Sequence, residues 1–395
     1  MKLAVMLLIY TAVTLLALLL LDGLLRRAFP HKGKRIRIAA CAVCAVFLLF
    51  PPAGALVPDG PLCWFFQRWG NIFTGFMLYF FGPLLLIRLP AVPVRLAARC
   101  LRGRKDGERP GLSRGLLVSL LLLTVFVNLY GMHIAQDVRV TRYEIPKETL
   151  SQDEPLRIVL VADLHIGVNS SPSLMRTMTE RINGQDADLV VVAGDLITSS
   201  FGAVRNTDAY ADALRGIRSK YGVYAVYGNH DVDEPLLGGF TFAGGSAVRN
   251  PGLVRFVSGL GWHMLEDETV RLPELTGLVI AGRRDKSRPG DGIDKRKDLA
   301  ELLGETDPSA PVLLLQHEPE DLDLLGGCGV GLSLSGHTHD GQIFPGNLIT
   351  RMLSPQSYGL RQWNGTYAAV TSGVGYYGPP IRVGTISEIA VIDLV

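Results

Sequence analysis

Residues 156–167 read LRIVLVADLHIG and set the pattern for the second half of the chain. The run 156–162 is apolar and rich in Val, Ile and Leu, which is typical of a strand buried on both faces. Asp163 and His165 follow it directly, and side chains two residues apart lie on one side of an extended chain. We therefore expect this carboxylate and this imidazole to reach one metal ion together.

Short apolar runs alternate with amphipathic stretches over the rest of this half. Further strands are predicted at 189–193, 223–227, 278–281, 312–316 and 330–334, and within the tail at 367–394. Helices are predicted at 172–183, 207–218, 295–303 and 319–325. Strands that alternate with helices at this spacing are typical of βαβ units around a largely buried sheet. The predicted fold class is therefore α/β.

Residues that can bind metal follow these strands, and ligand sites of open α/β sheets collect at the C-terminal ends of strands. Five of the eight histidines lie in such positions. The motifs are Asp163-Leu164-His165, Gly194-Asp195, Gly228-Asn229-His230-Asp231, His317 and Gly336-His337-Thr338-His339. Each motif alone has an ordinary explanation, such as a helix cap at Asp195 or a turn at 229–231. The ordered set, with each member directly after a strand, predicts a metal site.

This mixture of ligands suits a pair of divalent ions. Two ions roughly 3.5–4 Å apart can hold a phosphoryl group together with the oxygen that attacks it. Imidazoles combined with carboxylates favour Mn, Fe or Zn over Ca. We expect two divalent ions, with Mn as the first choice and Zn or Fe as alternatives.

The first 134 residues have a different character. They contain four apolar runs, at about 3–21, 38–57, 69–87 and 115–134, each near the roughly 20 residues that cross a bilayer. A buried helical bundle in a soluble domain is the alternative, but four such runs in so short a stretch favour membrane spans. Positive charges follow the first run and no small-residue cleavage site closes it, unlike a signal peptide.

Charge predicts an orientation for these spans. Residues 1–134 carry a net charge of +12, and residues 135–395 carry a net charge of −10. The first loop holds six Lys or Arg and the third holds eight, whereas the second, around 58–61, holds none. Loops rich in Lys and Arg stay in the cytoplasm. The cell membrane is thus the expected location, with the second half outside the cytoplasm and close to lipid headgroups.

Composition argues against two other functions. The acidic second half is a poor candidate for unaided binding to nucleic acid, because a phosphate backbone requires surplus Lys and Arg. Cys41 and Cys44 form a C-x-x-C inside an apolar run with no strand before it, so we interpret them as membrane-buried rather than redox-active. Cys328 is alone in the second half, so no disulfide forms within it.

The ordered motifs resemble those of the calcineurin-like metallophosphoesterases, from about Leu156 to the C-terminus. The resemblance is greatest to the bacterial membrane-anchored branch, because residues 336–342 read GHTHDGQ and Pro380-Ile381-Arg382 precedes Glu388. It implies a metallophosphoesterase-type β-sandwich flanked by helices, here preceded by a four-helix transmembrane region.

The resemblance also implies a role for each site residue. The implied ligands are Asp163, His165 and His339 for the first ion, Asn229, His317 and His337 for the second, and Asp195 bridging both. A hydroxide between the ions would attack, while His230 would contact the phosphate, protonate the leaving group and be oriented by Asp231. The family usually has Gly where this chain has Asp340, and we expect that side chain to point to solvent.

These features predict a membrane-anchored, metal-dependent phosphoesterase, with residues 1–134 as the transmembrane region, 135–154 as a linker and 155–395 as the catalytic domain. The tether near lipid headgroups favours a lipid-linked or envelope-associated phosphoester or pyrophosphate as substrate. The alternative is a non-catalytic membrane scaffold or transporter with an extracytoplasmic binding domain. The four runs contain no acidic residue, whereas ionisable side chains usually mark a transport path.

Overall fold

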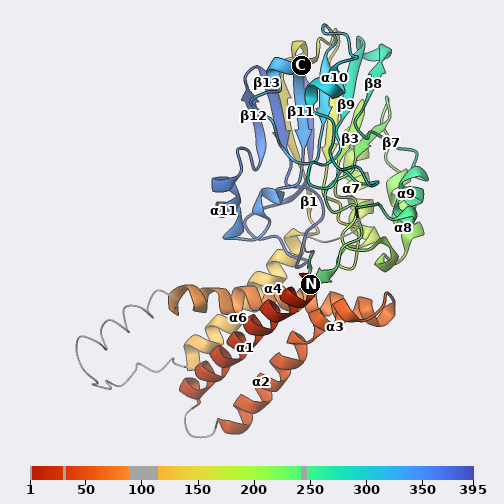
Figure 1. The fold of residues 1–395 in the computed structure, drawn as a ribbon. Coiled ribbons are helices and arrows are strands. Elements are labelled where there is room, and N and C mark those ends of the chain that lie inside the picture. Colours follow the sequence, from red (N-terminus) through yellow and green to blue (C-terminus); the bar gives the residue numbers. More distant parts are fainter. Residues whose placement is uncertain (1, 30–32, 89–113, 242–246) are drawn as a thin grey trace. The chain divides into compact units, whose positions relative to one another are not determined.

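Figure 1 shows the computed structural model, which describes residues 2–29, 33–88, 114–241 and 247–395. The chain forms two compact units, one of residues 1–130 with 237–239 and one of residues 131–236 with 240–395. Lys32 of the first loop and the basic residues between 95 and 109 of the third lie outside the described residues. The structure therefore does not describe some of the Lys and Arg residues on which the expected orientation of the spans depends.

The first unit is built from apolar helices. They are α1 (Lys2–Ala28), α2 (Lys34–Leu48), α3 (Phe50–Leu56), α4 (Pro61–Arg88) and α6 (Arg114–Ile134). Leu and Ala, which dominate these runs, are strong helix formers. Pro51 and Pro52 open α3, where a missing backbone N–H has no consequence. The expected run at 38–57 therefore forms two successive helices.

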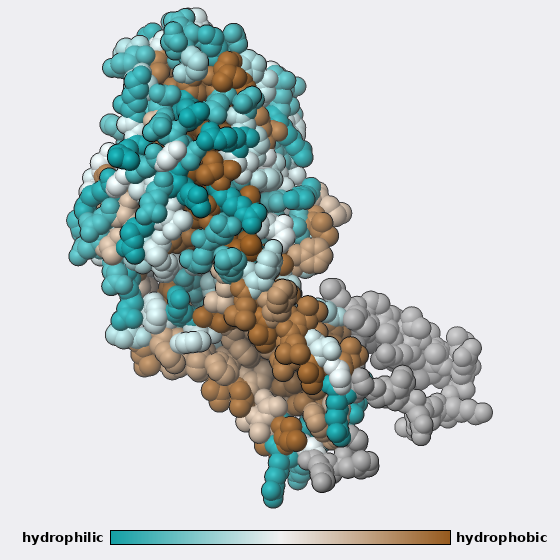
Figure 2. Space-filling model, turned by 180° about the vertical axis from the view of Figure 1, so that it is seen from behind, coloured by the Kyte–Doolittle hydropathy of each residue, from teal (hydrophilic) through white to brown (hydrophobic). Residues whose placement is uncertain are grey.

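Three helical stretches among the described residues are long and apolar enough to cross a membrane: Ala4–Ala28, Lys34–Leu56 and Arg114–Ile134. They coincide with the first, second and fourth expected spans. The third expected span, 69–87, lies within α4, which is a continuous helix but is not among the three. Hydrophobic residues gather on the helices of this unit in Figure 2, whereas the visible face of the other unit is mostly hydrophilic.

The second unit contains two six-stranded sheets. In spatial order, the first sheet consists of β1 (Val138–Ile145), β14 (Ser387–Leu394), β2 (Leu156–Val161), β3 (Leu189–Ala193), β4 (Val223–Val226) and β7 (His263–Met264). The second consists of β12 (Gly359–Trp363), β13 (Thr366–Val370), β11 (Val330–Ser335), β10 (Val312–Leu315), β9 (Leu278–Gly282) and β8 (Glu268–Leu272). The central strands β2, β3 and β4 pair in parallel, as do β9, β10, β11 and β13. A short separate pair is formed by β5 (Leu236–Leu237) and β6 (Phe240–Thr241).

Strand β2 shows how the layers form, because successive side chains of a strand point to opposite faces. Ile158 and Leu160 share a buried cluster with Leu313 of the second sheet. Val159 and Val161 belong to a different cluster on the other face. Both faces of the strand are buried, as its uninterrupted apolar run predicts. The two sheets pack as a sandwich, which confirms the expected fold.

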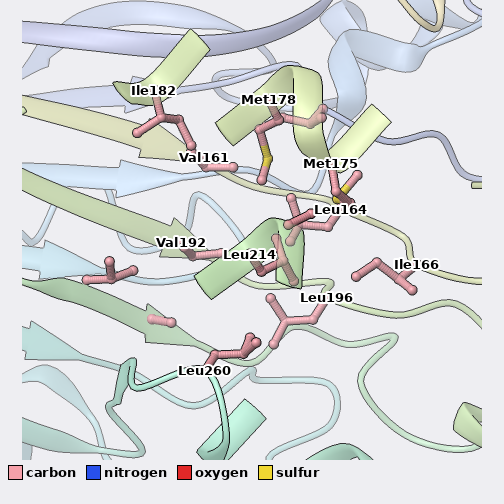
Figure 3. Close-up of a cluster of buried hydrophobic side chains, with 14 of the residues drawn as sticks. Val161, Leu164, Ile166, Met175, Met178, Ile182, Val192, Leu196, Leu214 and Leu260 are labelled. Carbon is pink, nitrogen blue, oxygen red and sulfur yellow. The ribbon is translucent and has the colours of Figure 1, made fainter. Parts of the chain in front are cut away.

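Helices cover the outer faces of the sandwich. Side chains of α7 (Pro172–Asn183) and α8 (Thr207–Arg215) pack on the first sheet, among them Met175, Met178 and Leu214 (Figure 3). Ser171 caps α7 by accepting a hydrogen bond from the backbone N of Leu174. The remaining helices of this unit are α9 (Pro251–Ser258), α10 (Leu299–Leu303) and α11 (Gly346–Leu353).

Three segments differ from their sequence-based expectation. Residues 138–145, within the expected linker, form β1, which pairs along its length with β14. Polar residues alternate along this edge strand, so its sequence lacks the apolar run that identifies the central strands. Residues 319–325 form turns instead of a helix, because Asp321 has a φ of 56° and its carboxylate binds Arg283. Of the expected strand 381–383, Val383 forms only an isolated bridge to Ile343.

Candidate metal centre

The predicted ligands lie where strands of both sheets end. Asp163 and His165 follow β2, Asp195 follows β3, Asn229 follows β4, His317 follows β10, and His337 and His339 follow β11. These strands are parallel within their sheets, so their C-terminal ends share one edge of each sheet. The structure therefore brings together all seven residues that the sequence motifs singled out as ligands.

The first cluster contains Asp163, His165 and His339, all buried. Nε2 of His165 lies 2.9 Å from Nε2 of His339, and the latter lies 3.5 Å from Oδ1 of Asp163. One ligand atom from each residue lies within 4.8 Å of the others. Donor lone pairs that converge so closely in a buried site are suited to a cation between them.

The second cluster contains Asp195, His317 and His337. Nε2 of His317 lies 3.2 Å from Nδ1 of His337, and Oδ1 of Asn229 lies 3.0 Å from both of these nitrogens. The amide oxygen of Asn229 thus completes a set of one carboxylate, two imidazoles and one amide.

Asp195 lies between the two clusters. Its Oδ2 atom is 3.1 Å from Nε2 of His317 in the second cluster and 3.7 Å from Nε2 of His165 in the first. The side chain of Asp195 is almost completely buried, at 1% exposure. This position fits the bridging role that the sequence resemblance implies.

The backbone of the site is held in an unusual conformation. Five of the seven residues have a positive φ: Asp163, His165, Asp195, His337 and His339. Non-glycine residues rarely adopt this region, and such residues cluster at functional sites. Gly194 also has a positive φ, of 80°, and a Cβ there would lie 2.7 Å from Nδ1 of His317. A glycine is therefore required for the second cluster to close.

Hydrogen bonds on the far side of the rings orient the ligands. Nδ1 of His317 lies 2.8 Å from the carbonyl oxygen of Ala193. Because a carbonyl can only accept, Nδ1 carries a proton, which leaves Nε2 as the ring atom directed at the cluster. Nδ1 of His165 lies 2.6 Å from Oγ1 of Thr198. Such outer contacts set the tautomer of a metal-binding histidine.

Burial prepares the imidazoles and carboxylates differently. It lowers the pKa of His165 to about 3 and that of His337 to about 4, so both rings are neutral and able to bind metal at pH 7. Burial also raises the pKa of Asp163 to about 7. Burial raises the pKa of Asp195 as well, but the neighbouring imidazoles of His317 and His230 outweigh it and hold that pKa well below its usual range.

His230 lies beside the clusters without belonging to either. Its backbone N donates to Oδ1 of Asp195 over 2.9 Å, and its ring stacks on Tyr377 with the centroids 4.6 Å apart. Nδ1 of the ring lies 2.8 Å from Oε2 of Glu234 and 3.1 Å from Oγ1 of Thr241. The side chain is about one-seventh exposed, at 14 %. It can therefore reach a substrate while its other nitrogen is held by the protein.

The structure gives the orienting role to Glu234 and not to Asp231. The carboxylate of Asp231 accepts hydrogen bonds from the backbone N of Gly228 and of Ile197. It therefore braces the turn that carries Asn229 and His230, whereas Nδ1 of the imidazole lies within hydrogen-bond distance of Glu234 and Thr241. Asp231, the partner of the ring expected from the sequence, is not among the described hydrogen-bond partners of the imidazole, because backbone N–H groups of Gly228 and Ile197 occupy its carboxylate.

Asp340 also departs from expectation. Its side chain is buried instead of solvent-exposed, and its carboxylate accepts two hydrogen bonds from Arg351, at 3.0 Å from Nε and 2.6 Å from one terminal nitrogen. Arg351 lies on α11, eleven residues away, so no local signal predicts the pair. The carboxylate next to His339 is thus neutralised by an arginine.

Two further residues near the site, both arginines, were missed by sequence reasoning. Arg288, from the segment between β9 and α10, forms an ion pair with Glu234. Arg382 is fully buried, lies 3.4 Å from Nδ1 of His339 and donates to the carbonyl oxygens of Ser372, Gly373 and Gly375. Only Arg382 carried a usable signal, since its P-x-R motif was noted without a role.

The donor set fits two divalent ions. Each cluster combines imidazole nitrogen with carboxylate oxygen, a mixture that suits Mn, Fe or Zn better than Ca. The two clusters share the neighbourhood of Asp195, as a pair of nearby ions requires. The described residues therefore match the expected pair of ions, while their identity is open among these metals.

Comparison with known proteins agrees with this geometry. Residues 156–341 match the family profile described as calcineurin-like phosphoesterase. A transmembrane protein with metallophosphoesterase domain from Danio rerio is 31% identical over 291 residues, which cover 70% of this chain and 62% of that protein. A metallophosphoesterase of Campylobacter jejuni is 30% identical, covering 70% of this chain and 69% of the relative. The UDP-2,3-diacylglucosamine pyrophosphatase LpxG of Chlamydia trachomatis is 23% identical, covering 60% of this chain and 82% of that protein.

The chain spans about three fifths of the length of the first relatives. The activities of those whole proteins are therefore not assigned to this chain by similarity alone. The family itself follows from the matched profile, the coverage of the Campylobacter protein and the two clusters of ligands at the strand ends. This chain belongs to the calcineurin-like phosphoesterases.

Proposed function

We propose that this protein is a membrane-anchored phosphoesterase that depends on two divalent metal ions. The observation that carries the proposal is the position of Asp195, with one carboxylate oxygen directed at a histidine of each cluster. A single structural ion would need only one of the two clusters. Two adjacent ligand sets with a shared carboxylate are suited to phosphoryl transfer to water.

The bound ions would lower the pKa of the attacking water and offset charge on the phosphoryl oxygens. The chain's own residues supply the rest. Asp163, His165 and His339 would hold the first ion, and Asn229, His317 and His337 the second, with Asp195 between them. His230 would donate a proton from Nε2 to the leaving oxygen, because Nδ1 is already engaged by Glu234.

The anchoring proposal extends to topology and substrate. We infer four spans, with the third formed by α4, and a catalytic unit outside the cytoplasm. A substrate in or near the lipid headgroups, carrying a phosphoester or pyrophosphate, matches this location. The name of the Chlamydia relative, a pyrophosphatase for a diacylated sugar nucleotide, supports the same substrate class.

The experiment uses the full chain purified in detergent. Bound metal is measured by inductively coupled plasma mass spectrometry, and hydrolysis of bis-p-nitrophenyl phosphate is followed with and without added Mn²⁺. We expect about two ions per chain and Mn²⁺-dependent hydrolysis. Asp195→Ala is expected to lose both metal and activity, and Asp212→Asn, at an exposed carboxylate of α8, serves as the matched control.

The outcomes separate the competing functions. Folded protein that binds no Mn²⁺, Fe²⁺ or Zn²⁺ would overturn the metal assignment and favour a membrane scaffold with a binding domain. Two bound ions without hydrolysis of any phosphodiester, monoester or lipid pyrophosphate would overturn the enzymatic role alone. Hydrolysis that persists in Asp195→Ala would show that the active site lies elsewhere.

A further inference from the structure

Helix α11 presents its side chains in an inverted arrangement. Leu348, Ile349, Met352 and Leu353 are 50%, 55%, 83% and 79% exposed, whereas the polar Asn347 is buried. Phe344, just before the helix, is 47% exposed. On a surface helix of a soluble domain the apolar stripe normally faces the core. The apolar side of this short helix is therefore turned outward, and Phe344, Leu348, Ile349, Met352 and Leu353 are named here the α11 patch.

The α11 patch is connected to the end of a candidate membrane span. The backbone N of Phe344 donates to the carbonyl oxygen of Val383 over 2.8 Å. The neighbouring residue, Arg382, donates its backbone N to the carbonyl oxygen of Gly131 over 2.9 Å. Gly131 begins the last turn of α6, a helix apolar enough to cross a membrane. Two backbone hydrogen bonds thus join the start of α11 to the point where the chain leaves that span.

The same helix is connected to the metal centre. Arg351 of α11 forms the two hydrogen bonds to Asp340, and Asp340 follows the ligand His339 in the chain. The Arg351 side chain is itself half-exposed, at 51%. A cation at the border of an apolar face is the arrangement of helices that lie in the plane of a membrane interface.

We propose that α11 inserts its apolar patch into the headgroup region of the lipid bilayer and so holds the metal centre at the membrane surface. The occupant of the patch is the bilayer, because α6 ends beside it and an interfacial helix needs only one apolar face. A second copy of the chain fits less well, since stable protein interfaces bury about 800 Å² per partner and one two-turn helix offers far less. The proposal rests on the membrane anchoring proposed above and adds the surface through which the catalytic unit meets lipid.

The test measures depth directly, without an activity assay. The full chain is reconstituted in phosphatidylcholine vesicles with or without bromine atoms on the acyl chains near the headgroups, and tryptophan fluorescence is compared. Met352→Trp places a probe on the patch. Leu324→Trp is the matched control, because Leu324 is also an exposed apolar residue, at 61%, and belongs to the turns before β11. The four native tryptophans contribute equally to both variants.

We expect the fluorescence added by Met352→Trp to fall by half or more in brominated vesicles, and that added by Leu324→Trp to stay unchanged. Equal quenching of the two probes, or none at position 352, would overturn the proposal. If the fluorescence of Met352→Trp shows a water-excluded probe in both kinds of vesicle but is not quenched by bromine, the patch would be assigned to a second copy instead. Flotation of the vesicles measures membrane anchoring separately. If the protein floats with the vesicles but the probe at 352 is not quenched, only the role of α11 is overturned. If the protein does not float, the membrane anchoring is overturned as well.

A second pair of variants relates the patch to catalysis. Met352→Asp combined with Leu353→Asp is expected to lower hydrolysis of a vesicle-embedded lipid phosphate about tenfold or more, because charged side chains oppose insertion. Hydrolysis of soluble bis-p-nitrophenyl phosphate by the same variant is expected to remain that of the wild type. An equal loss on both substrates would show that α11 supports the fold and not the approach to lipid. Absence of hydrolysis in the wild type would instead count against the proposed function and leave the quenching result standing.

Discussion

The imidazole of His230 is held by the carboxylate of Glu234, with Nδ1 of the ring 2.8 Å from Oε2. The carboxylate is fully buried and its other oxygen forms an ion pair with Arg288. A carboxylate that holds one ring nitrogen leaves the other available to protonate a leaving group. Glu234, four residues beyond His230 in the chain, is thus placed to orient the proposed general acid.

Glu234→Gln is expected to lower kcat about tenfold or more while two metal ions remain bound. The amide keeps the shape of the side chain but cannot stabilise a protonated ring, so the acidic form of His230 becomes less populated. The descending alkaline limb of the pH–rate profile should move to lower pH. Mass spectrometry of bound metal and the pH dependence of kcat provide the measurement, with Asp212→Asn as control. An unchanged profile would limit Glu234 to a structural role.

His230→Ala is expected to reduce turnover by about 10²- to 10⁴-fold, the usual contribution of a general acid. The clusters should still bind metal, because the ring is not among their ligands. His263→Ala removes an exposed histidine that stacks on Tyr224 and belongs to neither ligand cluster, and it provides the control. Substrates with a good leaving group, such as p-nitrophenol, should be less affected. Full turnover of His230→Ala on a poor leaving group would remove the acid assignment.

The ion pair between Asp340 and Arg351 predicts an asymmetry between its two partners. Arg351→Ala leaves a buried carboxylate without its cation, which we expect to cost about 1 kcal/mol because the arginine is half-exposed. Asp340→Gly should cost less, since the stranded arginine can be solvated and glycine tolerates the φ of 48° at this position. Thermal unfolding of both variants checks the order. Equal losses in the two variants would contradict the predicted asymmetry.

Metal affinity is expected to fall as the pH falls below about 7. In the metal-free protein, burial raises the pKa of Asp163 to about 7, so this ligand carries a proton below that pH. A divalent ion must then displace the proton, which weakens binding about tenfold per pH unit for each proton released. Above pH 7 this carboxylate is already ionised and no longer contributes to the dependence. Calorimetric titration with Mn²⁺ between pH 5.5 and 8 at constant ionic strength gives the slope, and a flat response would contradict the assignment of Asp163.

Much of this arrangement was predictable because the signals are local. The run 156–162 buries alternate side chains on both of its faces, so its hydrophobicity alone indicates a central strand. The ligands follow their strands directly, and the ends of parallel strands necessarily meet. The four apolar runs similarly predict helices by composition, and all four are helical in the described residues.

Other features depend on contacts between segments that are distant in the chain. Strand β1 has a polar, alternating pattern, and only its pairing with β14, more than 240 residues away, makes it a strand. The turns at 321–325 replace a predicted helix because Arg283 binds Asp321. Asp340 is buried instead of exposed because α11 brings Arg351 to it.

The sequence by itself therefore determined the alternation of buried strands and helices, the apolar helices and which candidate metal ligands follow the strands, since each depends on side chains next to one another in the chain. The tertiary structure decided which carboxylate holds His230, what neutralises Asp340 and which helix turns its apolar side outward. These features depend on where distant segments of the chain contact one another. Once such a contact is buried, a charged side chain in it requires a partner and an imidazole ring in it requires a hydrogen bond. No local pattern of residues carries that information.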